Sequence, residues 1–576
     1  MRIRDGLVAY SQSAIQGDIR STDGDIRFRN LLGKYGIVTL GKDETNSVGR
    51  KWRSAMGKLG FLYPEVKNNM GFTQADLGQV DTITPAGWNL IKAETVPAIQ
   101  ECFLRAMVTP METCNNGKSF SPLCWTLALL LALEKSNLET SIHFIEMALF
   151  VQTSTPDDGL AKLIRELSDF RKQKEQSENK RNFDQKIYAE FARKTEKKAN
   201  TFRDYADMNI RYLKATGMVH AHGKGIALVP EKHALAVALT QELLFDKPLL
   251  ERYKTLCKGS ILPTDNALVA RQVLSELLRE VKKFNITYSI DNRSLNTPTE
   301  INQVRYEIEE LIAGKKEEEY ANNQATQWKE IAAYMDLIAS RKTRISHDDI
   351  EISVPRSEAP AYLEWSLWRA FLAIDTLVNT PNKVRRFKVD QDFMPVSTAP
   401  GNGPDLIAEF DDCVIVIEVT LSESSRQEAM EGEPVRRHVA DLMQEYQKPV
   451  YGLFIANRID SNTAETFRIG VWYTRDDIRL NLQIVPFTLE QFSSFFKAIF
   501  TSGTANPKTV IELIVKCSSL KKECEAPQWK QHIETIIKDT VLTIEEIAFN
   551  AIKSVRQGES LEVIKTIKEF LYKICM

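Results

Sequence analysis

The alternation of hydrophobic and polar residues predicts a mainly helical first half of the chain. Trp52, Met56 and Leu59 recur at helical spacing, Gly60 ends that helix, and a short strand follows at 61–63. Basic residues occupy the other faces of this helix: Arg50, Lys51, Arg53 and Lys58. The pattern of helix, short strand and turn is typical of a winged helix, a module that binds DNA in some proteins and other proteins elsewhere.

Two later segments repeat this design. Residues 81–94 predict a strand, a turn at 85–87 and a helix, and residues 204–232 predict a helix that ends at Gly217 before two short strands. Between these segments, the apolar run 123–133 predicts a buried helix, since it is shorter than the ~20 residues that cross a bilayer.

The pattern changes twice further along. Two helical runs fill residues 300–345, and the proline-containing stretch 353–360 marks a boundary. Beyond it the chain becomes mixed α/β, with a helix over 360–377 and strands near 386–389, 405–410, 413–420, 449–456 and 482–487. We therefore expect a multidomain α+β protein. Its predicted parts are a recognition region with winged-helix-like subdomains (1–245), a helical linker (246–355) and a C-terminal α/β domain (356–576).

A buried acidic residue marks the candidate chemistry. Residues 411–420 (DDCVIVIEVT) predict a buried strand with Glu418 in its apolar run, where a carboxylate is costly unless it has a partner. Asp405 begins another strand after a Gly-rich turn, so an antiparallel pairing would bring Asp405 and Glu418 to one end of the sheet. Clustered carboxylate oxygens suit a hard cation such as Mg²⁺. From these residues alone, the alternative to a cation site is that the buried carboxylate of Glu418 has a purely structural partner.

Composition narrows the function classes. The net charge is only −2, so any binding of DNA requires a local positive surface, such as the Lys/Arg-rich stretch 171–198. The eight cysteines form no CxxC pair and no secretory signal precedes residue 20, so we expect a cytoplasmic protein without a membrane span. The nearest approach to a phosphate-binding loop, 217–225, has the wrong spacing, which argues against a nucleoside triphosphate as partner.

Four blocks together resemble a known family. LEWSLWRAF (363–371), FMPVSTAPGNGPD (393–405), IVIEVTLS (415–422) and MEGEPVRRH (430–438) are similar to the AlwI family of type IIS restriction endonucleases, which includes strand-specific nicking enzymes. Their order and spacing match over about 75 residues. The N-terminal segments and the helical connector also fit that family's layout of recognition and cleavage.

The resemblance implies a PD-(D/E)XK-like cleavage domain and a set of site residues. The implied catalytic residues are Glu364, Asp405, Glu418, Glu431 and His438, with Asp405 and Glu418 as ligands of Mg²⁺. Thr420 stands where the general pattern has lysine, so Glu431 or His438 would share the role of that lysine. Arg436 and Arg437, just inside a helix that Pro434 begins, could hold a phosphate.

The function expected from the resemblance is Mg-dependent cleavage of double-stranded DNA at a fixed offset from a short recognised sequence. Implied partners are a second copy or a small catalytic subunit for the second strand, and a cognate DNA methyltransferase that protects the host genome. Two alternatives stay open: a nicking endonuclease or large subunit of a heterodimer, and a non-catalytic winged-helix DNA-binding regulator.

Overall fold

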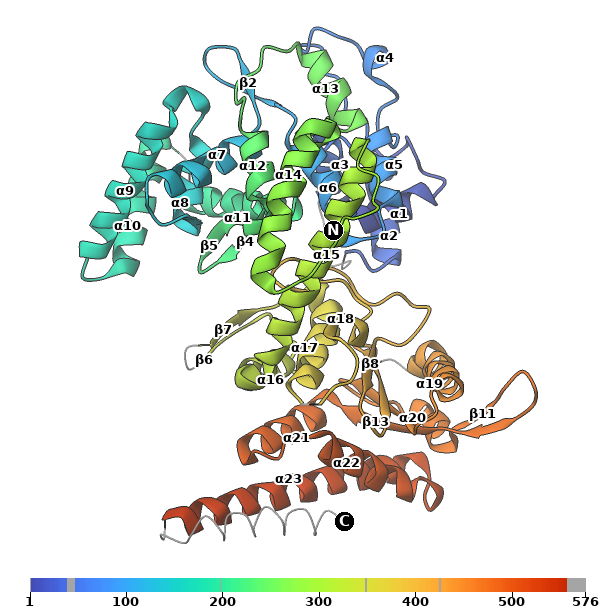
Figure 1. Cartoon of the computed structure of the whole chain (residues 1–576). Helices are drawn as coiled ribbons and strands as arrows, with labels where there is room; N and C mark the ends of the chain where they lie inside the picture. The colour runs from blue at the N-terminus through green and yellow to red at the C-terminus, as the bar shows by residue number, and fades with distance from the viewer. Residues whose placement is uncertain are drawn as a thin grey trace. The chain divides into compact units, whose positions relative to one another are not determined.

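The structure is a computed structural model that describes residues 2–38, 47–196, 198–347, 350–374, 376–423 and 426–556. The chain divides into two compact units (Figure 1). Unit 1 comprises residues 1–313 and 390–392, and unit 2 comprises residues 314–389 and 393–576. Each unit has its own hydrophobic core, and each is described separately below.

The first part of unit 1 is a helical cluster. Its main elements are α1 (Arg2–Ser11), α2 (Thr22–Lys34), α3 (Ser47–Lys58), α5 (Pro85–Lys92) and α6 (Val96–Met107). As predicted, Gly60 follows the end of α3, and it has a positive φ of 72°. The predicted strands are reduced to a single bridge between Leu62 and Ile83. The turn predicted at 85–87 is wrong, because these residues form the first turn of α5, where Thr84 accepts a hydrogen bond from the Gly87 N–H.

The second part of unit 1 surrounds a buried helix. Its elements are α7 (Pro122–Lys135), β3 (Ser141–His143), α8 (Phe144–Leu149), α9 (Leu160–Gln176), α10 (Lys180–Thr195), α11 (Ala199–Ala215), β4 (Val219–His222), β5 (Gly225–Leu228) and α12 (His233–Leu239). Helix α7 is buried on all sides, as predicted for 123–133. The predicted helix and hairpin of 204–232 are present as α11 and β4–β5, which join β3 in a three-stranded sheet. A winged helix as such is not confirmed.

The helical runs predicted over 300–345 are present but do not form a separate linker unit. They are α15 (Pro298–Asn322) and α16 (Trp328–Ala339), and the boundary between the units falls within α15. Helix α13 (Leu249–Lys258) is followed along the chain by α14 (Ala267–Glu280). The first part of α15 packs against α14 in a small apolar core of unit 1. Helix α16 belongs to the core of unit 2. Each of these helical segments therefore buries its apolar face in the core of its own unit, because that face needs a packing partner.

Unit 2 is built on a four-stranded sheet in the order β13-β10-β9-β8. Its strands are β8 (Leu406–Glu409), β9 (Val414–Thr420), β10 (Val450–Ala456) and β13 (Gln483–Thr488). Strands β9, β10 and β13 are parallel, and β8 is antiparallel to β9. All four were predicted. The strand expected near 386–389 is reduced to isolated bridges, one of which joins Arg385 to Leu406.

Helices enclose this sheet (Figure 1). Helix α17 (Ala359–Ala373) contacts β8 and β9, α19 (Glu433–Glu445) contacts β9 and β10, and α20 (Ser461–Ile469), α21 (Leu489–Ser502) and α22 (Pro507–Ser519) contact β13. The long helix α23 (Ala526–Arg556) packs on α20, α21 and α22. Two hairpins, β6–β7 (Arg344–His347, Ile350–Ser353) and β11–β12 (Val471–Tyr473, Arg479–Asn481), and the short α18 (Pro381–Val384) complete the unit. Because both faces of β9 are covered, its residues from Val414 to Glu418 are all buried.

Gly452 in β10 allows α19 to lie close to the sheet. A Cβ atom at this position would lie 2.8 Å from Cγ1 of Ile484 on β13 and 3.0 Å from Cγ2 of Val439 on α19. Such distances are shorter than ordinary carbon–carbon contacts. A residue with a side chain here would therefore force Ile484 or α19 to move.

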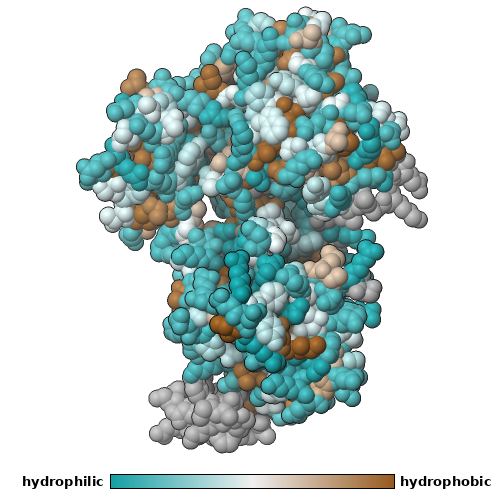
Figure 2. Space-filling model, turned by 90° about the vertical axis from the view of Figure 1, so that its right-hand side faces the viewer, coloured by the Kyte–Doolittle hydropathy of each residue, from teal (hydrophilic) through white to brown (hydrophobic). Residues whose placement is uncertain are grey.

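The face of the molecule shown in Figure 2 is mostly polar. On this face, hydrophobic side chains appear as small patches among hydrophilic ones. No helix in the described part of the chain has both the length and the apolar character needed to span a membrane.

Candidate active site

Asp405 and Glu418 face each other across the β8–β9 pair. The antiparallel register joins Leu406 to Ile417, so one step further it places Asp405 opposite Glu418. The Val419 N–H donates a hydrogen bond to Oδ2 of Asp405 at 2.8 Å, which holds this carboxylate against the end of β9. Glu418 is only 7% exposed. The predicted juxtaposition of these two carboxylates at one end of the sheet is therefore present.

Two further acidic residues come from the helical segments around the sheet. Glu364 lies in α17, is 6% exposed, and its Oε2 accepts a hydrogen bond from the Ala399 N–H at 2.7 Å. Glu431 lies in a π-helical turn (Glu428–Gly432) directly before α19, and its carboxylate is hydrogen-bonded to Thr420 at the end of β9. Such π turns change the direction in which a helix presents its side chains and are frequent at functional sites.

His438 completes the cluster from α19. Its Nδ1 lies 2.6 Å from Oε1 of Glu418, and the side chain is almost fully buried. Among the described residues, no group makes a hydrogen bond to its Nε2, which is also buried. An unsatisfied buried nitrogen is costly, so the position of Nε2 fits a ligand, a water molecule or a substrate proton as its partner.

The electrostatics show that the carboxylates are crowded. Burial first, and Glu431 second, raise the pKa of Glu418 from its usual 4.5 to about 8. Burial and the charge of Glu418 also raise the pKa of Asp405, and burial and Asp405 raise that of Glu364. Burial lowers the pKa of His438, so its imidazole is neutral at neutral pH. Several acids with raised pKa values in one buried place are typical of sites that bind a cation or transfer protons.

A cation that the sequence analysis did not select also belongs to this cluster. The charge of Arg386 lowers the pKa of both Glu418 and His438, and its main-chain N–H donates to the Asp405 carbonyl at 3.3 Å. Its guanidinium donates to Oδ1 of Asn402 at 2.8 Å. The only available signal in the sequence was an Arg-Arg pair before a predicted strand, which does not distinguish Arg386 from Arg385.

The donor set fits a small hard cation. Within the described ranges, no group of three or more His, Cys, Asp or Glu side chains has the arrangement of a complete metal site. Mg²⁺ does not need such a group, because it commonly keeps several waters and binds one or two carboxylates together with substrate phosphate. Asp405 and Glu418 supply two carboxylates at one sheet end, and a cation between them would offset the burial and the neighbouring negative charges that raise their pKa values.

Comparison with known proteins identifies the family. The AlwI restriction endonuclease family matches residues 57–495, about three quarters of the chain. The chain belongs to the AlwI restriction endonuclease family. It is thus a restriction enzyme, a nuclease that acts on DNA. No curated protein matches.

Among solved structures, the chain is similar to the crystal structure of the small subunit of the heterodimeric restriction endonuclease R.BspD6I. The identity is 22%, and the match covers 36% of this chain and 98% of that one, with a TM-score of 0.28.

The basic residues on α3 that were predicted to contact DNA differ in their exposure to solvent. Arg50, Lys51 and Lys58 on α3 are exposed. Arg53 is not: its guanidinium pairs with Asp25 at 2.9 Å, and only 10% of its side chain is accessible. This ion pair ties α3 to α2, so Arg53 already has a structural partner within the protein.

The two predicted phosphate ligands on α19 are also engaged with the protein. Arg436 donates to the Gly432 carbonyl at 3.1 Å and lies over the Trp472 ring, with its guanidinium carbon 5.8 Å from the ring centroid. Arg437 pairs with Glu433 at 3.0 Å but stays 37% exposed, and its charge lowers the pKa of Glu418.

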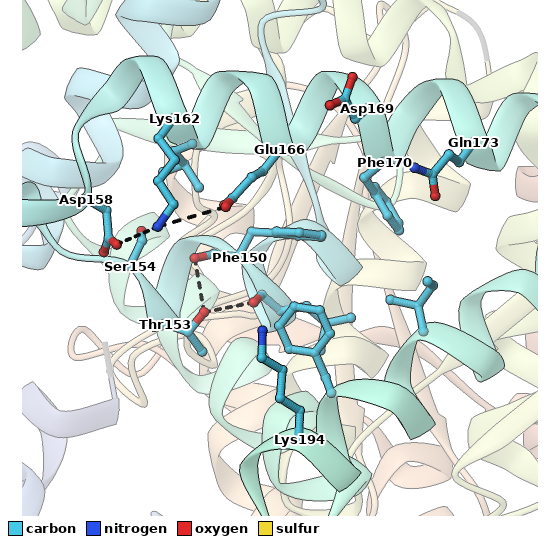
Figure 3. A pocket seen from close by; sticks show the side chains of 14 residues that line it. Phe150, Thr153, Ser154, Asp158, Lys162, Glu166, Asp169, Phe170, Gln173 and Lys194 are labelled. Atoms are coloured by element: carbon cyan, nitrogen blue, oxygen red, sulfur yellow. Dashed lines mark hydrogen bonds and ion pairs between the residues drawn. The ribbon is translucent and has the colours of Figure 1, made fainter.

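The Lys/Arg-rich stretch 171–198 is not a uniformly free positive surface. Arg171 pairs with the buried Glu146 at 2.7 Å, and Lys174 pairs with Asp184 at 2.8 Å. Helices α9 and α10 also line a cavity of about 500 Å³ (Figure 3). The charged side chains around it are Asp158, Lys162, Glu166, Asp169 and Lys194. Three acids against two lysines do not favour a phosphate in this cavity.

Proposed function

We propose that this chain is a type IIS restriction endonuclease that cuts DNA with Mg²⁺ held by Asp405 and Glu418. The proposal rests above all on the placement of Asp405 opposite Glu418 across β8–β9, with His438 2.6 Å from Glu418. The order Pro404-Asp405 followed by Glu418-Val419-Thr420 on adjacent strands supports a PD-(D/E)XK-like site in which threonine replaces the lysine.

The roles of the side chains follow from their protonation. A bound Mg²⁺ would polarise the scissile phosphate and lower the pKa of the attacking water. In the ionised state that binds a cation, Glu418 can only accept a hydrogen bond, so Nδ1 of His438 carries the proton in their 2.6 Å contact. Nε2 then has a free lone pair and can take a proton from water as the water oxygen bonds to phosphorus. The bond to the sugar oxygen breaks, and the departing oxygen takes a proton from solvent to become a hydroxyl group.

Glu431 is the second candidate for the role of the missing lysine. Its hydrogen bond to Thr420 places its carboxylate beside the position where the PD-(D/E)XK pattern has lysine. Glu364 accepts a hydrogen bond from the Ala399 N–H and would hold the turn at Ala399 in place. Its carboxylate would also add negative charge near the cation.

The offset between recognition and cleavage is part of the proposal. The exposed basic residues of α3 belong to unit 1, and the acids of the candidate site belong to unit 2. If unit 1 recognises the DNA sequence and unit 2 cuts, the cut position is set by protein geometry and not by the bases at the cut.

The test combines a plasmid digest with sequencing of the cut ends. The wild-type protein with Mg²⁺ should cut genomic DNA at one distance from a common short sequence. Asp405→Ala and Glu418→Ala should abolish cutting and retain binding to the same duplex. Randomised bases at the cut position should leave the rate unchanged, and cutting confined to particular bases there would contradict the offset model.

A nicking enzyme is the second candidate. The proposed site, with Asp405, Glu418 and His438, is a single site, and a single site cuts one strand per engagement. A second copy or a small catalytic subunit would have to supply the other cut. Open-circular product from supercoiled plasmid indicates nicking, and linear product formed in proportion to the square of enzyme concentration indicates transient dimerisation.

A further inference from the structure

The geometry points to Arg386 as a ligand of a phosphodiester in the strand that is cut, an inference that rests on the proposed function. Arg386 lies on the outer side of β8, where its N–H bonds to the Asp405 carbonyl, while Glu418 lies on the other side of Asp405. Neighbouring strands are about 4.8 Å apart. The guanidinium therefore belongs to the same end of the sheet as the carboxylate pair.

Within the described ranges, the groups that accept hydrogen bonds from the guanidinium of Arg386 are neutral. It donates to Oδ1 of Asn402 at 2.8 Å and to the Pro404 carbonyl at 3.4 Å. Gly403 between them leaves room for it, since a Cβ there would overlap with Nη1. The Gly-rich turn thus holds the guanidinium close to the main chain through two hydrogen bonds, which restrict its orientation.

Arg386 has no carboxylate partner within ion-pair distance among the described residues, although it lies near enough to Glu418 for its charge to lower the pKa of that carboxyl group. Its neighbour Arg385 is different, because both its Nε and its Nη2 bind Glu317, at 2.6 and 2.9 Å. A guanidinium has five N–H donors, and the two contacts of Arg386 leave most of them unused. A half-buried, unpaired guanidinium with restricted orientation is suited to a planar or tetrahedral oxyanion that comes from outside the protein.

A phosphodiester is the oxyanion that the site would meet. Two of its oxygens can accept both N–H groups of one guanidinium edge, and negative charge grows on them as water adds to phosphorus. Arg386 would then both hold the strand and stabilise the transition state. The same geometry permits contact with the scissile phosphate or with the phosphate next to it.

The experiment uses the full-length protein and a duplex that carries the cleavage site mapped for the wild type. Arg386→Gln should lower kcat/KM about 10²–10³-fold. Arg386→Lys keeps the positive charge but not the paired N–H groups of the guanidinium, so its kcat/KM should lie between those of Arg386→Gln and the wild type. Lys383→Gln, the same loss of charge at an exposed residue three positions away, should change it less than about twofold. Asn402→Ala removes the contact with the turn and keeps the charge, so a purely structural Arg386 would give equal losses in Arg386→Gln and Asn402→Ala.

Neutral methylphosphonates at single positions of the cut strand identify the phosphate. At one position, the methylphosphonate should slow the wild type and Lys383→Gln by a larger factor than it slows Arg386→Gln. This difference should remain even at the scissile position, where loss of the oxygen that Mg²⁺ would polarise slows all three proteins. If Arg386→Gln stays as sensitive as the wild type at every position, or cuts at the rate of Lys383→Gln, the inference is wrong while the proposed function stands. If the wild-type protein cuts no DNA with Mg²⁺, the proposed function fails and the inference fails with it.

Discussion

His438 and Glu418 form a buried contact between α19 and the central strand β9, with Nδ1 2.6 Å from Oε1. The contact couples the protonation of the two side chains. When Glu418 is ionised, His438 must hold its proton on Nδ1, and when Glu418 is protonated, the donor can be the carboxyl group. The state that can bind a cation is therefore also the state in which Nε2 can accept a proton.

Glu418→Gln should give a protein that is inactive and, without metal, more stable than the wild type. The raised pKa of Glu418 means that its ionised form is disfavoured in the fold. An amide of the same shape removes that cost, so above pH 8 the free energy of unfolding should increase by about 2–4 kcal/mol. Denaturant unfolding in EDTA measures it. Glu445→Gln, on an exposed position of α19, serves as the control and should leave both stability and cleavage unchanged.

Stability without metal should fall as the pH rises. Burial raises the pKa values of Asp405 and Glu418 to about 8 in the folded state and also raises that of Glu364. The folded state therefore binds more protons than the unfolded one between the usual carboxyl range near 4 and about 8. The stabilising effect of these protons is complete below pH 4 and is lost as the pH rises to 8. Thermal unfolding in EDTA, compared with Glu418→Gln, isolates this contribution from the other titrating groups.

Mg²⁺ should compete with protons at the same site. The cation needs ionised carboxylates, so cleavage should rise from pH 6 to pH 8.5, and higher Mg²⁺ should move the acid limb of the profile to lower pH. Mg²⁺ should also raise the Tm more at pH 8 than at pH 6. An acid limb that does not move with Mg²⁺ concentration would contradict the assignment of Asp405 and Glu418 as metal ligands.

His438→Gln should reduce the cleavage rate about 10²–10⁴-fold, with little change in DNA affinity, because the residue would act on the attacking water. Single-turnover cleavage and a binding assay in Ca²⁺ separate the two quantities. His532→Gln is a suitable control, since His532 is exposed on α23. Equal losses of binding and cleavage in His438→Gln would indicate that the histidine only supports the fold.

Two neighbouring basic residues on α3 should respond differently to substitution. Lys51→Ala should weaken binding to all duplexes and reduce the slope of log K against log salt by about 1. Arg53→Ala leaves Asp25 without its ion-pair partner and should instead lower stability by about 2–4 kcal/mol. Parallel salt titrations and unfolding curves give both results, and a normal Tm for Arg53→Ala would refute the structural role.

The central part of unit 2 could be predicted because its residues carry strong local signals. The alternation in β9 and the buried Glu418 indicated both the strand and its unusual carboxylate, and the Gly-rich turn before Asp405 indicated a paired strand. Glu364 and Glu431 lie in helical segments where an acidic residue is unremarkable, so only the family resemblance selected them. The ion pair of Arg53 could not be predicted, because helical spacing does not show that Asp25 lies next to it.

The close approach of α19 to the sheet at Gly452 makes the position of that helix depend on a residue outside the proposed site. Val439, the neighbour of His438, rests above Gly452, so a larger side chain there would lift the helix that carries His438 and follows Glu431. Gly452→Val should then leave every site residue unchanged and still impair cleavage. In relatives with an intact set of acids and histidine, a small residue at this place in the central strand becomes a further criterion for separating active enzymes from inactive ones.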